Sequence, residues 1–141
     1  MEDYNQVEEQ NFAPYAATTD YCNSGNANGV SHGFGNVLVY NGNIKEGACH
    51  IQYYHLAHPG METAIVDGVR KTQFRSNLSR TDMANIAGQA IAGATSEDAG
   101  DGKFKAESYV ISTNSKIRVI YYNKKIENTT YKVVITMYPI Y

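Results

Sequence analysis

The chain has 141 residues, of which 43% are hydrophobic and 18% are charged. This length suits one domain, and the hydrophobic content excludes wholesale disorder. The longest apolar runs, such as Val133-Val134-Ile135, are far shorter than the ~20 residues of a membrane-spanning helix. The acidic start, Met1-Glu2-Asp3, lacks the basic and apolar regions of a secretory signal, so we expect neither a membrane span nor a signal of that type.

The net charge of −2 conceals an uneven distribution along the chain. Residues 1–30 contain five acidic residues and no Lys or Arg, whereas residues 103–141 contain seven basic and two acidic residues. We therefore expect an acidic leader over 1–36 and a single folded domain over 37–141. The basic C-terminal third is either a solvated sheet face or a surface for a polyanion.

The first expected elements are short. Residues 1–36 are rich in Asn, Gly, Ser and Thr, which predicts a leader and loop with little helix or strand. Val37–Tyr40 predicts a buried strand, and the turn sequence Asn41-Gly42-Asn43 ends it. A second strand over 51–54, with His50 at its start, would complete a short hairpin.

The clearest helix is expected over 79–94. Ser79 and Asp82 have the spacing of a capping box, and apolar residues then recur at helical spacing. The sequence therefore predicts one amphipathic helix in the middle of the chain.

After Gly102 the hydrophobic period changes to two. This alternation predicts strands over 107–113, 116–122 and 131–138. Consecutive strands with short links form an antiparallel meander. The predicted fold class is therefore α+β, with an N-terminal loop and helix region carrying a short hairpin, one clear amphipathic helix and a C-terminal antiparallel β-meander.

The last strand offers a surface for a ligand. Strict alternation places Tyr131, Val133, Ile135 and Met137 on the core face and Lys132, Val134, Thr136 and Tyr138 on the opposite face. Thr136 and Tyr138 would then lie about 7 Å apart, where a hydroxyl and a phenol ring can hydrogen-bond to and stack on a base. The plain alternative is ordinary strand composition, since Thr and Tyr are both favoured in strands.

All four histidines lie between His32 and His58. Imidazole exchanges a proton near neutral pH, so a pair of histidines can perform acid/base chemistry without a metal. The alternative for each is a surface histidine or a satisfied core histidine. A zinc site made by His50, His55 and His58 is a further alternative, although their spacing matches no established zinc signature.

Two cysteines, Cys22 and Cys49, fit no metal-binding or redox spacing. They form one disulfide or remain two buried thiols, and the sequence leaves both open. Cys49 beside His50 also suggests a thiol nucleophile. Adjacent residues of a strand point to opposite faces, which disfavours a dyad from this pair.

Basic residues follow the sequence Asp67-Gly68. Lys71, held on a turn or strand near the sheet, could stabilise the negative charge of a pentavalent phosphorane. Arg70 precedes it, and the default interpretation of both is a solvated charge.

Taken in order, His50, Lys71, the expected helix and the terminal Thr136-Met137-Tyr138-Pro139 look like the EndoU-like (uridylate-specific endoribonuclease) family. Its bacterial members include toxin domains of contact-dependent inhibition. The Gly-rich segment before His50 resembles the family's approach to a catalytic histidine. Lys71-Thr72-Gln73-Phe74 resembles its lysine with a following hydroxyl residue and Phe. The similarity covers about residues 36–141.

The resemblance implies a nuclease-like catalytic domain over 37–141 that cleaves single-stranded RNA, possibly tRNA, by attack of the 2′-hydroxyl to give a 2′,3′-cyclic phosphate. The expected catalytic residues are His50, Lys71, Thr136, Tyr138 and His32, and the expected substrate-binding residues are His55, Thr72, Ser76 and Lys132. No metal or cofactor is expected.

One position departs from the family pattern. The chain has Asn36 where the family has its first histidine, so His32, His55 or His58 would supply the second imidazole. The ribonuclease A-like toxin class is a related resemblance, in which His55 or His58 would act with Arg70. Both imply the same class of reaction.

The resemblance also implies partners and a location. The expected partners are an RNA substrate and a cognate immunity protein of acidic surface. The protein itself would be a secreted or delivered effector that acts in the cytoplasm of a target cell. Two alternatives from other classes stay open. One is a non-catalytic β-rich module that binds carbohydrate or protein, favoured by the 12 Tyr and 12 Gly residues. The other is a cysteine hydrolase that uses Cys49.

Overall fold

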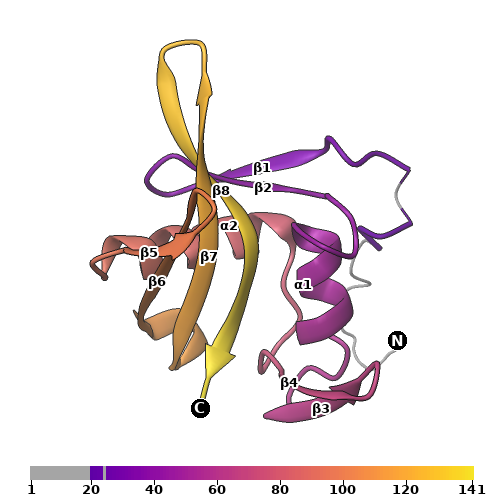
Figure 1. Cartoon of the computed structure of the whole chain (residues 1–141). Helices are drawn as coiled ribbons and strands as arrows, with labels where there is room; N and C mark the ends of the chain where they lie inside the picture. The colour runs from indigo at the N-terminus through magenta and orange to yellow at the C-terminus, as the bar shows by residue number, and fades with distance from the viewer. Residues whose placement is uncertain (1–19, 24) are drawn as a thin grey trace.

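The structure is a computed structural model that describes residues 20–23 and 25–141. These residues form two helices, a six-stranded sheet and a separate two-stranded sheet (Figure 1). The larger sheet has the order β1-β2-β8-β7-β6-β5, and its last four strands form an antiparallel meander. The expected α+β class with a C-terminal meander is confirmed.

The elements follow one another along the chain as below. They are β1 (Val30–Gly33), β2 (Val37–Tyr40), α1 (Ala48–His55), β3 (Thr63–Val66), β4 (Val69–Thr72), α2 (Arg80–Ala92), β5 (Glu97–Gly100), β6 (Lys103–Val110), a 3₁₀ turn (Ile111–Thr113), β7 (Ser115–Ile126) and β8 (Thr129–Ile140). No helix of the described ranges 20–23 and 25–141 is both long and apolar enough to cross a bilayer.

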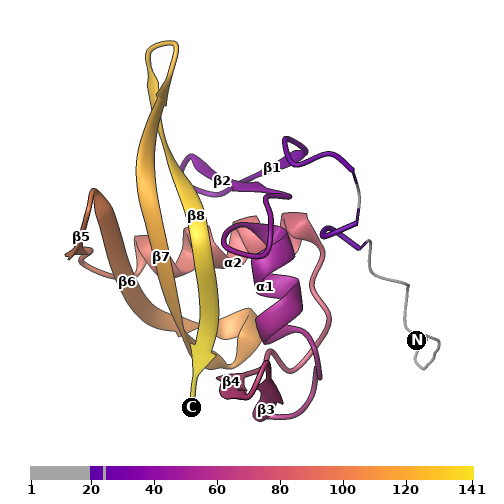
Figure 2. The same ribbon diagram turned by 45° about the vertical axis from the view of Figure 1, so that its right-hand side comes forward.

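Helix α2 covers one face of the large sheet and lies behind it in Figures 1 and 2. Its N-cap is Ser79, whose side chain accepts a hydrogen bond from the Asp82 backbone N–H while the Asp82 side chain accepts one from the Ser79 N–H. The expected capping box is thus present. The buried stripe of α2 packs on strand residues such as Val119 and Met137, each 0% exposed.

Strand pairing assigns residues to the two faces of the sheet. Val119 pairs with Met137, and both belong to the core against α2. The next pair, Arg118 with Tyr138, therefore lies on the other side, which we call the open face. Thr136 pairs with Ile120 and shares this face with Tyr138, as alternation predicted.

A β-bulge in β8 changes the rest of that prediction. Ile120 pairs with Thr136, but its neighbour Tyr121 pairs with Val134, so Ile135 is an extra residue. Val134 thereby joins Met137 in the core, whereas Tyr131 and Val133 move to the open face. Of the predicted core set of Tyr131, Val133, Ile135 and Met137, only Met137 belongs to the core against α2, while Val133 is buried, at 4% exposed, on the other face.

Helix α1 occupies the segment where we expected a strand. Its N-cap is Gly47, where φ is 85° and ψ is −161°, a conformation that favours glycine. The Gly47 N–H donates to the carbonyl of the bulged Ile135, at 2.9 Å between N and O. The bulge thus holds the first turn of α1 against β8.

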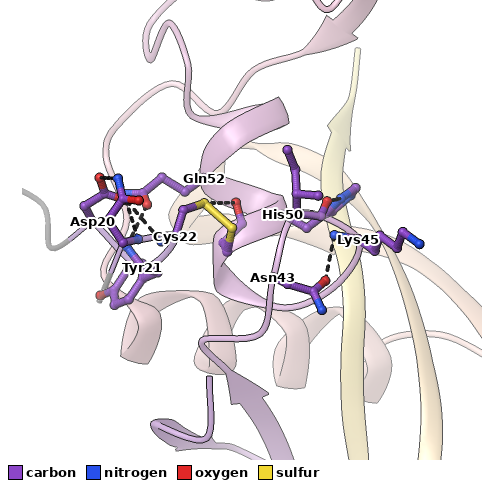
Figure 3. Close-up of a disulfide and its surroundings, with 10 residues drawn as sticks. Asp20, Tyr21, Cys22, Asn43, Lys45, His50 and Gln52 are labelled. Atoms are coloured by element: carbon purple, nitrogen blue, oxygen red, sulfur yellow. Dashed lines mark hydrogen bonds between the residues drawn. A yellow bond between two sulfur atoms is a disulfide. The ribbon is translucent and has the colours of Figure 1, made fainter. Parts of the chain in front are cut away.

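The two cysteines form a disulfide that ties the N-terminal segment to α1, which decides between the two alternatives left by the sequence. Figure 3 shows Cys22 on one side of α1 and His50 on the other. Cys49 is therefore not a free thiol, and a cysteine hydrolase is contradicted.

Several strands exceed the expected boundaries. β1 lies within the segment expected to be loop, and it pairs antiparallel with β2, so the partner of Val37–Tyr40 precedes it in the chain. Asp67-Gly68 and Asp101-Gly102 have positive φ and join the unexpected hairpins β3–β4 and β5–β6. Of the expected leader, residues 1–19 and 24 lie outside the described residues.

Candidate active site at the junction of α1, β4 and β8

Helix α1 brings two imidazoles onto the open face beside β8, His50 from its first turn and His55 from its last. His50 and Tyr54 are one helical turn apart, with ring centroids separated by 5.0 Å. The His55 ring stacks on Tyr138 of β8 at 4.9 Å, and its centroid is 5.9 Å from that of His50. Two histidines and two tyrosines therefore form one contiguous ring cluster.

Both imidazoles are held in the same tautomer. Nδ1 of His50 lies 2.9 Å from the Ile44 carbonyl oxygen, and Nδ1 of His55 lies 2.8 Å from that of Thr72. A carbonyl oxygen only accepts, so each Nδ1 carries the hydrogen. Nε2 of each ring is thereby left as the atom that takes or gives a proton.

The environment keeps the two histidines neutral. Burial lowers the pKa of His55 to about 4, the Thr72 hydrogen bond opposes this shift, and the charges of His50 and Lys71 add to it. Burial also lowers the pKa of His50, where Lys71 acts in the same direction. His55 is only 4% exposed, so it is the more strongly affected of the pair.

Strand β4 supplies the cation of the site. The ammonium of Lys71 lies over the Tyr54 ring, 5.3 Å from its centroid. The fully buried Gln73 fixes the end of β4 to α1, because its amide donates to the carbonyl of Tyr54 at 2.7 Å and accepts from the backbone N–H of His58 at 3.0 Å. Lys71 is thereby held within electrostatic range of both imidazoles.

Strand β7 places a second cation, Arg118, next to Tyr138. Arg118 donates from Nη1 to the Tyr138 hydroxyl at 3.2 Å, and its guanidinium carbon lies 5.6 Å from the ring centroid. Its Nε binds the Glu107 carboxylate, which neutralises part of this charge. The phenol is therefore oriented by Arg118 and the ring by His55.

Two threonine hydroxyls near this cluster lack partners. Oγ1 of Thr72 and Oγ1 of Thr136 are buried, and neither forms a hydrogen bond with any described residue. A buried hydroxyl without a partner costs about 1–3 kcal/mol. Such penalties gather where a structure is adapted to a ligand rather than to maximal stability.

The other predicted site residues lie elsewhere. His32 is exposed on β1, and its ring contacts Tyr131, seven residues before Tyr138 in β8. The structure brings His55, and not His32, beside His50. Lys132 pairs with Asn123, which places it by register on the side of the sheet opposite Tyr138.

Two further candidates are also displaced from the histidines. Ser76 is exposed and lines a cavity of about 420 Å³ beside α2, together with Arg75 and residues 112–115. Arg70 binds the Thr63 hydroxyl on the β3–β4 hairpin. Its neighbour Lys71 is the basic residue that faces the ring cluster.

Sequence reasoning missed three residues of the site. Tyr54, Gln73 and Arg118 were not singled out as functional, although Gln73 follows the Lys71-Thr72 pair and Arg118 lies in an expected strand. Helical spacing from His50 would have found Tyr54 if α1 had been predicted. No sequence signal marks the register that sets Arg118 opposite Tyr138.

Among residues 20–23 and 25–141, no group of three His, Cys, Asp or Glu side chains is arranged to hold a metal ion. Comparison of the chain with models of protein families, with curated proteins and with solved structures found no match.

Proposed function

We propose that the chain is a metal-independent endoribonuclease whose site is formed by His50, His55, Lys71 and Tyr138. The observation that carries this proposal is the pair of imidazoles with centroids 5.9 Å apart, each presenting Nε2, beside a lysine. Acid/base pairs of this kind can cleave RNA through its own 2′-hydroxyl, so the substrate must be RNA and not DNA.

The environments of the two histidines suggest a role for each. His55 has a pKa of about 4 and is neutral at neutral pH, so its Nε2 acts as the base that takes the 2′-hydroxyl proton. The 2′-oxygen then attacks phosphorus, the bond to the 5′-oxygen breaks, and His50 gives a proton to the leaving oxygen. The negative charge of a bound phosphate favours the protonated form of His50, opposing the effect of Lys71.

The remaining residues support the phosphorane and position the base. The ammonium of Lys71 offsets the charge that develops on phosphorus. Tyr138 holds the His55 ring by stacking. Its hydroxyl accepts a hydrogen bond from Arg118 and thereby keeps the guanidinium charge near the substrate. The buried, unpartnered hydroxyl of Thr136 would gain a partner from substrate once neighbouring side chains move aside on binding, which offsets its cost in the free chain.

A cleavage assay tests the proposal. A defined RNA is incubated with the protein in EDTA, and its new 3′ ends are analysed for a 2′,3′-cyclic phosphate. We expect cleavage, with a loss of about 10²–10⁴-fold in His50→Ala and in His55→Ala. His32→Ala is the matched control, because this histidine lies near Tyr131 and away from the cluster, and it should keep full activity.

Two outcomes would contradict the assignment. Equal activity in all three variants would remove the histidine pair from the mechanism. RNA that stays intact but binds would favour a non-catalytic binding module instead. Circular dichroism of each variant separates a lost function from a lost fold.

We further propose that the nuclease is a toxin domain delivered to target cells and restrained by an acidic immunity protein. The disulfide suits passage through an oxidising compartment, since such bridges persist there. The basic residues of β6 and β7 suit a partner of opposite charge. Binding of the product of a neighbouring gene, with loss of cleavage, would support this, and its failure to bind would contradict it.

A further inference from the structure

The open face continues beyond the active site as a row of cations and tyrosines. Lys103 pairs with Tyr122, and Lys124 pairs with Tyr131, so all four residues lie by register on the same side as Arg118 and Tyr138. Lys105, which pairs with Ile120, also lies there. We define the basic strip as Tyr40, Lys103, Lys105, Tyr122, Lys124 and Tyr131.

Neither of the two described helices covers this part of the sheet. Figures 1 and 2 show α2 behind the strands and α1 beside the C-terminal half of β8, while the β7–β8 hairpin extends away from both helices. Lys124 lies over the ring of Tyr40, 5.1 Å from its centroid, and Lys103 is exposed on β6. The strip therefore presents charged groups and rings to the surroundings.

The charge of the strip is positive after its acidic neighbours are counted. Glu97 binds Lys105 at 3.8 Å, and Glu46 lies within electrostatic range of Tyr122. Neither Lys103 nor Lys124 forms an ion pair with any residue in the described part of the chain. The surface thus suits a polyanion.

The rings add a preference for unpaired bases. One face of Tyr138 is already occupied by His55, so its ring is less available for stacking. Tyr40, Tyr122 and Tyr131 are only partly buried and lie between or beside lysines. Aromatic rings alternating with cations bind single strands without sequence preference, because every base can stack.

We propose that the basic strip is the binding track for single-stranded RNA that leads to the cleavage site. Along β8, the seven steps from Tyr138 to Tyr131 span roughly 23 Å, so the track extends well beyond one scissile phosphate. This inference rests on the proposed function only for the statement that the bound RNA leads to the cleavage site. The inference itself concerns RNA binding and not the chemical step.

Binding is measured in the His50→Ala background, which removes a catalytic side chain outside the strip. Fluorescence anisotropy with a labelled twelve-nucleotide RNA compares Lys103→Gln/Lys105→Gln, Lys124→Gln and Tyr122→Leu. We expect about tenfold weaker binding for Tyr122→Leu, from lost stacking, and a salt slope reduced by about 0.7 for each lysine removed.

Lys125→Gln is the matched control. Lys125 follows Lys124 on the same strand, pairs with Thr130 and points to the opposite face, so this substitution should leave binding unchanged. An effect equal to that of Lys124→Gln would overturn the proposal, as would unchanged binding in the three strip variants. Tighter binding of duplex RNA than of the single strand would reassign the surface.

Cleavage assays separate this inference from the proposed function. With His50 restored, the strip variants should cleave a dinucleotide as fast as the wild type does. They should cleave the twelve-nucleotide RNA only poorly when the RNA concentration is low. Strip-dependent binding without any cleavage would contradict the nuclease and leave the track intact. Normal cleavage of the long RNA by every strip variant would contradict the track alone.

Discussion

The two helices differ in what holds them in place. α2 has 13 residues, a complete capping box and seven buried residues along one stripe. α1 has eight residues, no side-chain cap hydrogen bond at Gly47 and no acidic residue in its first turn. A helix of eight residues is marginal on its own, so α1 depends on the rest of the molecule.

Three tertiary contacts secure α1. They are the disulfide from Cys49 to Cys22, the hydrogen bond from Gly47 to Ile135, and the hydrogen bond from Gln73 to the Tyr54 carbonyl. α1 carries His50 and His55, whereas α2 carries core residues. The comparison shows that the helix with the candidate chemistry is positioned by distant parts of the chain, and that the helix of the core is specified locally.

Removing the disulfide should give the largest loss of stability. Its cysteines are 27 residues apart, and closing a loop of this size contributes about 3–4 kcal/mol. We expect Cys22→Ala/Cys49→Ala to lower the free energy of unfolding in urea by this amount, with faster amide exchange in α1 than in α2. Reductant should destabilise the wild type and leave the double variant unchanged. Equal stability of the two proteins would contradict the tie.

Acid should weaken the α1 side of the molecule through His55. Its pKa is about 4 in the folded chain and about 6.5 when unfolded, so the unfolded chain binds more protons between these values. The contribution of His55 to the free energy of unfolding should therefore be fully present above pH 6.5. The free energy of unfolding should fall by about 3 kcal/mol as the pH approaches 4. Denaturant titrations at several pH values measure this slope.

His55→Gln is the control for that slope. The variant lacks the titrating group, so the part of the acid sensitivity that belongs to His55 should disappear while carboxylate titration below pH 4.5 remains. An identical slope in wild type and variant would assign the acid sensitivity to other groups.

Gly47→Ala should disturb the start of α1. A Cβ at this position would lie 2.7 Å from the Tyr40 carbonyl oxygen, and φ is +85°. We expect a loss of about 2–3 kcal/mol in thermal or urea unfolding, with reduced RNA cleavage because the imidazoles shift from β8. Gly68 also has positive φ, but a Cβ there would meet no atom of the described residues within 4 Å, so Gly68→Ala should cost less and leave cleavage intact. Equal losses at both positions would contradict the contact.

Ser79→Ala should have the smallest effect and leave function intact. It removes one half of the capping box of α2, which typically costs about 1 kcal/mol. Because α2 contributes no residue to the ring cluster, we expect unchanged cleavage of RNA beside a modest fall in stability. Loss of cleavage in a Ser79→Ala protein that is still fully folded would show that the two helices are coupled.

The elements predicted correctly are those with local signals. The helix over 79–94 has its capping box and apolar stripe in consecutive residues, and the C-terminal strands have alternating side chains. The hairpins at Asp67-Gly68 and Asp101-Gly102 also have a local signal, the Asp-Gly turn, that our interpretation passed over.

The errors fall where a distant partner decides. Ile51-Gln52-Tyr53-Tyr54 has the composition of a strand, but it folds as part of α1 because the disulfide, β4 and β8 all contact that helix. Alternation in β8 fails at Ile135, since a bulge is a property of strand pairing and of the Gly47 hydrogen bond. His55 lies beside His50 because both residues belong to α1, which the sequence did not predict.

The amino-acid order by itself determined the α+β class, the capped helix α2, the meander and the placement of Thr136 and Tyr138 on one face of the sheet, because caps and periodicity act between neighbouring residues. The tertiary structure alone decided the disulfide, the bulge, the helical form of α1 and the set of side chains around Tyr138. These features depend on contacts between segments far apart in the chain, and only the folded backbone brings such segments together.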